Sequence, residues 1–136
     1  MKCLKKRSEF SLQSKHNVSS FFIPKQVTKS VFKKYVVFKV LTKPLNFEVE
    51  RRYSDFLWLR NYLAREFPGL YIPPMAPKDG KHFDEDYLNK RKEMLQAFVD
   101  DILEHPTLRV TQVFEDFLKI AGEDAFSQLM TNYENK

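Results

Sequence analysis

The chain has 136 residues, 43% of them hydrophobic and 15% aromatic, which is enough apolar material for one compact domain with tails and argues against a disordered chain. A single cysteine, Cys3, excludes an internal disulfide and fits a reducing compartment, and no apolar stretch reaches the roughly 18 residues of a membrane span. The net charge of +5 is uneven: residues 1–50 carry 11 basic and 3 acidic side chains, whereas residues 101–136 carry 3 and 7. This basic half could meet anionic lipid, nucleic acid or an acidic protein, although an ordinary solvated lysine coat explains it as well.

The N-terminal half predicts a flexible basic leader, residues 1–18, followed by three short strands. The first strand is interrupted or edged by Pro24. The second belongs to the stretch that is richest in β-forming residues. In the third, the side chains alternate cleanly between the two faces of the strand. An antiparallel meander is the simplest arrangement of these strands, which are centred on residues 21–27, 31–41 and 47–53.

At Ser54 the spacing of apolar residues changes from every second residue to about every 3.6 residues, which predicts a helix with Ser54 as its N-cap. The apolar stripe of this helix ends before Pro68-Gly69, and it consists of Phe56, Leu59, Leu63 and Phe67. A proline-rich connection over residues 72–82 follows.

Two further helices are predicted by their caps and stripes. Asp84 is a plausible cap for a long helix that His105-Pro106 ends, and Thr111 for a shorter one that Ala121-Gly122 breaks. A last amphipathic turn or two is suggested by Ala125, Phe126, Leu129 and Met130. Strands first and helices afterwards indicate the α+β class.

The run Arg51-Arg52-Tyr53-Ser54 lies where the strand pattern gives way to the helix pattern. A guanidinium can bind two phosphate oxygens at once, and a helix N-terminus adds N–H donors and the positive end of the dipole. These residues therefore suit a phosphate carried on a ring. The competing interpretation, favoured for such a motif in isolation, pairs Arg51 and Arg52 with Glu48 or Glu50 and packs Tyr53 in the core.

Several motifs in order together resemble the phox-homology (PX) domain, most closely the sorting-nexin type, over roughly residues 20–121. They are Arg51-Arg52-Tyr53-Ser54-Asp55-Phe56, Phe67-Pro68-Gly69, Ile72-Pro73-Pro74-Met75-Ala76-Pro77-Lys78 and the segment from Arg91 to Phe98. The resemblance implies a three-stranded antiparallel sheet packed against a helical subdomain of three to four helices with a proline-rich loop. It also implies a pocket for phosphatidylinositol 3-phosphate.

The resemblance assigns five residues to the lipid headgroup. Arg52 is similar to the arginine that clamps the 3-phosphate, with Ser54 touching the same phosphate and Tyr53 lying under the inositol ring. Lys78 resembles the lysine that holds the phosphate joining inositol to glycerol. Arg91 matches the arginine that bonds the hydroxyls at positions 4 and 5, whereas the position of Arg51 is more often structural in this family.

The loop after Pro77 departs from the family pattern because it is short and polar. Lys81 could therefore compete with Lys78 as a phosphate contact, and only Met75 and Phe83 are obvious candidates for insertion into a membrane. The three histidines lack partners at metal-ligand spacing, so no metal site is expected.

The resulting hypothesis is a non-enzymatic module without a cofactor, cytoplasmic and peripheral on endosomal membranes. Its expected partners are phosphatidylinositol 3-phosphate and other trafficking proteins, with no nucleic acid. The expected domain covers residues 19–122, and residues 123–136 form a helical extension or the start of a linker. Two alternatives stay open: a protein–protein adaptor with a weak or absent lipid pocket, and a nucleic-acid binder whose basic strands carry aromatic rings.

Overall fold

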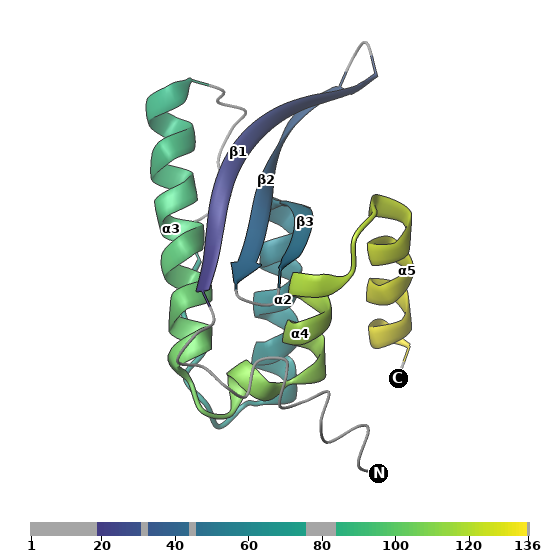
Figure 1. Cartoon of the computed structure of the whole chain (residues 1–136). Coiled ribbons are helices and arrows are strands. Elements are labelled where there is room, and N and C mark those ends of the chain that lie inside the picture. Colours follow the sequence, from purple (N-terminus) through teal and green to yellow (C-terminus); the bar gives the residue numbers. More distant parts are fainter. Residues whose placement is uncertain (1–18, 31–32, 44–45, 76–83, 136) are drawn as a thin grey trace.

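The computed structural model describes residues 19–30, 33–43, 46–75 and 84–135, with side chains from Val36 onward. Figure 1 shows the arrangement of the strands and helices. The strands are β1 (Ser19–Ser30), β2 (Lys33–Lys43) and β3 (Phe47–Arg52). The helices are α2 (Tyr53–Glu66), α3 (Glu85–Glu104), α4 (Gln112–Lys119) and α5 (Glu123–Glu134), with a short 3-10 turn, η3 (Leu108–Val110).

The three strands form the predicted antiparallel meander in the order β1-β2-β3. The first strand is longer than predicted, because β1 runs for 12 residues, and Pro24 does not interrupt it but lies opposite Phe38, which leaves the alternative of an edge position. Among the described strands β1 lies at one edge of the sheet, where a residue without an N–H can be accommodated.

Helix α2 begins two residues earlier than predicted. Tyr53 is the first residue of α2 and Arg52 is its N-cap, so the prediction that Ser54 caps the helix is wrong. The capping carboxylate comes from Asp55, whose Oδ2 accepts the backbone N–H of Arg52 at 2.8 Å. In a capping box, the side chain at the third helical position accepts the backbone N–H of the N-cap residue, and Asp55 does this for Arg52. Ser54 is exposed in the first turn.

The other predicted caps are confirmed. Asp84 Oδ2 accepts the backbone N–H of Tyr87 at 3.2 Å, and Thr111 Oγ1 accepts that of Phe114 at 3.3 Å. His105 is the C-cap of α3, as the His105-Pro106 signal predicted. Side chains thus satisfy N–H groups that have no partner inside the helix.

The core lies between the sheet and helices α2, α3 and α4 (Figure 1). The ring of Phe56 on α2 is central to it, with its centroid 6.5 Å from that of Phe38 on β2 and 5.0 Å from that of Phe117 on α4. Both contacts are edge-to-face, the arrangement that aromatic pairs prefer. The predicted stripe of α2 is confirmed for Phe56, Leu59 and Leu63, which are fully buried, whereas its fourth residue, Phe67, is half-buried and is the C-cap that follows the helix.

A buried arginine joins β3 to the C-terminal end of α4. Arg51 is 1% exposed; its Nε donates to the carbonyl oxygen of Phe117 at 3.0 Å, its Nη1 to that of Glu50 at 3.0 Å, and its Nη2 to that of Ile120. The last carbonyls of a helix carry partial negative charge and lack intrahelical donors, so they suit a cation. The interpretation that Arg51 pairs with Glu48 or a Glu50 carboxylate is therefore wrong.

Aromatic rings cover the same guanidinium. Its central carbon lies 3.8 Å from the ring centroid of Phe126 on α5 and 5.3 Å from that of Phe117. Burial lowers the pKa of Arg51 to about 10, and the nearby carboxylate of Asp55 acts in the opposite direction. The carbonyl oxygens and ring faces compensate for the lost hydration, so Arg51 holds β3, α4 and α5 together.

Helix α5 is longer than the predicted turn or two. Gly122, which has a φ of 96°, separates it from α4, and this left-handed conformation is accessible to glycine without strain. The Oε2 atom of Glu134 accepts from Trp58 Nε1 at 2.8 Å and from Arg65 Nη2 at 2.7 Å, and Tyr133 donates its hydroxyl to Asp116 at 2.7 Å. These bonds fasten α5 to α2 and α4.

We predict that Arg51→Ala lowers the free energy of unfolding by about 3–5 kcal/mol, because it leaves buried carbonyl groups without donors and removes a buried cation from its partners. Urea unfolding followed by circular dichroism measures the change. Arg52→Ala is the matched control, since Arg52 is adjacent but exposed, and it should cost less than about 1 kcal/mol. Equal losses in the two variants would show that Arg51 has no special structural role.

A second prediction concerns pH. The hydrogen bonds from Arg65 and Trp58 lower the pKa of Glu134 below its ordinary value of 4.5. The stabilisation is therefore fully present above that ordinary value and is lost as the pH falls through the lower folded-state pKa. Trp58 is the only tryptophan, so its fluorescence should report loosening of α5 over this range.

Glu134→Gln keeps an oxygen acceptor but cannot titrate, and it is the control for this experiment. It should remove the acid-dependent change in fluorescence while far-ultraviolet circular dichroism stays constant. An identical acid transition in both proteins would assign the titration to another group.

Candidate functional site

The residues Arg52-Tyr53-Ser54 form the junction between β3 and α2. Arg52 and Ser54 are exposed, and Tyr53 is half-buried against the core. The N-terminus of α2 directs its first N–H groups and the positive end of its dipole to this place. The junction is thus chemically suited to an anionic group, although Asp55 already accepts the backbone N–H of Arg52.

Helix α3 contributes a second guanidinium to the junction. The central carbon of Arg91 lies 4.2 Å from the ring centroid of Tyr53 and 5.3 Å from that of Tyr87. Its Nη2 donates a hydrogen bond to the hydroxyl of Tyr87. The structure therefore brings Arg91 against Tyr53, the middle residue of the junction, although the two are far apart in the sequence.

The two tyrosines also restrict Arg91. Its side chain is buried, at 7% exposure, between Tyr53 and Tyr87. Because the guanidinium covers one face of the Tyr53 ring, a sugar-like ring could stack only on the other face. Burial and two aromatic contacts orient the guanidinium before any ligand arrives, which reduces the entropy lost on binding.

Sequence reasoning missed Tyr87. The signal was present, because Tyr87 and Arg91 are four residues apart on a predicted helix and such residues are neighbours on its surface. Nothing in the sequence alone distinguishes this tyrosine from an exposed one, and its contact with Arg91 is visible only in the structure.

The start of the proline-rich connection is held by α2. Arg60 Nε donates to the carbonyl oxygen of Pro73 at 3.4 Å, and Ile72 and Pro73 are buried. Met75, a predicted insertion residue, is half-buried and packs against the core. The other loop candidates, Lys78, Lys81 and Phe83, lie outside the described residues.

The fold and this site define a class of protein: an α+β module with a cationic strand-to-helix junction suited to a phosphorylated ring. Residues 42–121 match the PX domain family, and the chain belongs to that family. The matched residues include the junction and Arg91, and they end before α5 begins.

Similar proteins are sorting nexins. Mouse sorting nexin-7 is 34% identical over 105 residues, which are 68% of this chain and 27% of that protein. Human sorting nexin-8 is 29% identical over 118 residues, which are 87% of this chain and 25% of that protein. The chain thus spans about a quarter of the length of these relatives.

Solved structures agree with this assignment. A designed CISK-PX domain is 35% identical, has a TM-score of 0.61, and the similarity covers 74% of this chain and 96% of that one. The Vam7p PX domain has a TM-score of 0.51 at 22% identity over 77% of this chain and 97% of that one, and it supports the fold alone.

The chain is therefore a sorting-nexin-type PX domain, which supports its role as a membrane-targeting module of the kind used in trafficking. This class is non-enzymatic and associates with membranes peripherally. Within the described residues, no helix combines the length and the hydrophobicity that crossing a bilayer requires.

We predict that Tyr87→Phe weakens binding to phosphoinositide vesicles by about two- to tenfold, because Arg91 loses the hydroxyl that orients it. The variant keeps the aromatic ring and should keep its melting temperature within a few degrees. Vesicle sedimentation measures the affinity. Tyr71→Phe is the control, since Tyr71 is 74% exposed, and an equal effect in both variants would remove Tyr87 from the site.

Proposed function

We propose that this domain binds phosphatidylinositol 3-phosphate and brings its parent protein to endosomal membranes. The observation that carries the proposal is the position of Arg91, whose guanidinium lies 4.2 Å from the centroid of the Tyr53 ring, next to Arg52 at the start of α2. Arg91 on α3 and the ring of Tyr53 on α2 thereby meet directly after Arg52 in the chain, an arrangement suited to a phosphorylated ring.

Arg52 is the proposed clamp for the 3-phosphate. Its side chain is exposed, and the guanidinium has the planar fork that pairs with two phosphate oxygens. Ser54 is exposed in the first turn of α2 and would donate its hydroxyl to the same phosphate. The dipole of α2 favours the phosphate charge at this end of the helix.

The preference for a single phosphate would come from Arg91. If its guanidinium bonds the hydroxyls at positions 4 and 5, phosphates there would meet a space already filled by Arg91, Tyr53 and Tyr87. Specificity would then depend on steric exclusion of the more highly phosphorylated lipids as well as on favourable contacts with the singly phosphorylated one.

The proline-rich connection completes the proposal. Lys78, with Lys81 as an additional contact, would hold the phosphate that joins inositol to glycerol, and Phe83 and Met75 would enter the bilayer. Because Met75 packs against the core, its insertion would cost part of the roughly 1.5–3 kcal/mol that burial of such a side chain contributes. We therefore assign most of the free energy of membrane binding to contacts with the lipid headgroup and less to insertion of apolar side chains.

The binding module is proposed to span residues 19–122. Helix α5, inside the predicted extension 123–136, belongs to the same fold because Glu134 bonds to α2 and Tyr133 bonds to α4.

The decisive experiment is sedimentation with vesicles that each carry one phosphoinositide. We expect selective pelleting with the 3-phosphate lipid, and a loss of about tenfold or more in Arg52→Ala, since a charge-assisted bidentate contact contributes more than about 1.4 kcal/mol. Arg65→Ala is the control, because it removes the same charge at the opposite end of α2.

Circular dichroism should show that both variants keep the fold. Equal pelleting with every anionic lipid, unchanged by Arg52→Ala, would falsify the proposed pocket and leave only non-specific attraction to negative charge.

A further inference from the structure

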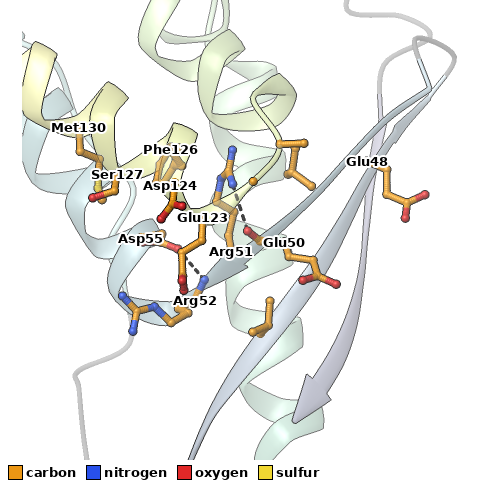
Figure 2. A pocket seen from close by; sticks show the side chains of 14 residues that line it. Glu48, Glu50, Arg51, Arg52, Asp55, Glu123, Asp124, Phe126, Ser127 and Met130 are labelled. Carbon is orange, nitrogen blue, oxygen red and sulfur yellow. Dashed lines mark hydrogen bonds between the residues drawn. The ribbon is translucent and has the colours of Figure 1, made fainter. Parts of the chain in front are cut away.

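A cavity of about 830 Å³ lies between the start of α2 and the start of α5 (Figure 2). Arg52 and Asp55 line it together with Glu123 and Asp124. The latter two belong to the first turn of α5 and lie beyond residues 42–121, the part that matches the PX family. Membership of the family therefore predicts nothing about these two carboxylates, although they share a cavity with the residue proposed to clamp the phosphate.

The charge of Glu123 reaches the start of α2. There the carboxylate of Asp55 accepts the backbone N–H of Arg52 at 2.8 Å. The pKa of Asp55 is raised, chiefly by burial, and the negative charge of Glu123 raises it further, while the hydrogen bond and the charge of Arg52 act in the opposite direction. A carboxylate on α5 thus acts electrostatically on a group that is bonded to Arg52.

The backbone holds the first turn of α5 in this position. Gly122, with its φ of 96°, precedes the turn, and the backbone N–H of Phe126 donates to the carbonyl oxygen of Gly122 at 3.0 Å. The ring of Phe126 lies against the guanidinium of Arg51, with its centroid 3.8 Å from the central carbon. Glu123 and Asp124 lie between these two anchored residues, so they stay beside the cavity as long as α5 is docked.

A phosphate bound to Arg52 would meet this negative charge. A phosphate monoester carries a charge of about −1.5 to −2 at pH 7, and like charges repel each other over several ångströms in a protein. Arg52 and Glu123 both have interactions within the domain, and neither has to be free for its charge to act on a ligand. The side chains of Glu123 and Asp124 are exposed, so salt weakens the repulsion.

We propose that Glu123 and Asp124 oppose the phosphate at Arg52 and thereby lower the affinity of the headgroup site, so that the start of α5 is an electrostatic restraint on the clamp. This inference rests on the proposed function, because it concerns the same clamp. The carboxylates reduce the net attraction of Arg52 for anions, so membrane binding depends more strongly on the other headgroup contacts, those of Arg91 and the Tyr53 ring. The acidic residues also favour the dipole of α5, but that effect stabilises the helix and does not change lipid affinity.

The test is sedimentation of the full chain with vesicles that carry phosphatidylinositol 3-phosphate. Glu123→Gln with Asp124→Asn removes both charges and keeps the shape of the side chains. It should raise the affinity about three- to tenfold at physiological salt, and the gain should shrink at about 0.5 M salt, where screening is stronger. The matched control, Asp101→Asn with Glu104→Gln, makes the same change of charge at exposed positions near the C-terminal end of α3, and it should change the affinity less than about twofold.

Further variants separate charge from shape and from stability. Glu123→Asp with Asp124→Glu keeps both charges and should bind the vesicles like the native chain. Asp124→Asn alone removes one charge and should give an intermediate gain, which decides the question if the double variant does not fold by circular dichroism. In the Arg52→Ala background, removal of both carboxylate charges should give no gain, because the restraint acts on that clamp.

A gain no larger than that of the control variant, or a gain that persists undiminished at high salt, would overturn the restraint. Failure of the proposed function gives a different result, because Arg52→Ala would then leave the binding of the native chain unchanged. If this inference alone fails, Arg52→Ala still loses binding and only the gain from the α5 variants is missing.

Discussion

The buried guanidinium of Arg51 joins β3 to α4 and α5, two helices that lie far from β3 in the sequence. It donates to carbonyl oxygens at the end of α4 and lies against the ring of Phe126 on α5, so the sheet and both C-terminal helices meet at one cation. Removing such a charge from water costs several kcal/mol, and only the complete set of carbonyls and rings offsets that cost. The position of β3 relative to the helices depends on this arrangement.

The same constraint places the candidate binding residue. Side chains alternate along a strand, so when Arg51 points into the core, Arg52 must point to solvent. Arg52 is also the N-cap of α2, where backbone N–H groups and the helix dipole favour an anion. The structural role of Arg51 and the proposed binding role of Arg52 are thus divided between adjacent arginines by the geometry of the strand. The resemblance to the family implied this division, and the pleat of the strand supplies its physical reason.

Much of the fold could be predicted because its signals are local. The meander, the α2 stripe and the caps Asp84 and Thr111 all depend on residues within about four positions of one another. One error arose at the start of α2, where two local caps compete, and the other arose at an edge of the sheet. Ser54 has good N-cap chemistry, but Asp55 caps the backbone of Arg52 instead, and Pro24 does not interrupt β1 because that strand lies at an edge of the described sheet.

By itself, the sequence determined the α+β class, the cationic junction at Arg52-Tyr53-Ser54 and the family, since alternation, caps and motifs are written in neighbouring residues. Only the tertiary structure decided that Arg91 lies over Tyr53 and bonds Tyr87, and that α5 docks against α2 and α4. The physical reason is that these contacts join residues far apart in the chain, and their geometry is fixed by how the core packs, which no local pattern encodes.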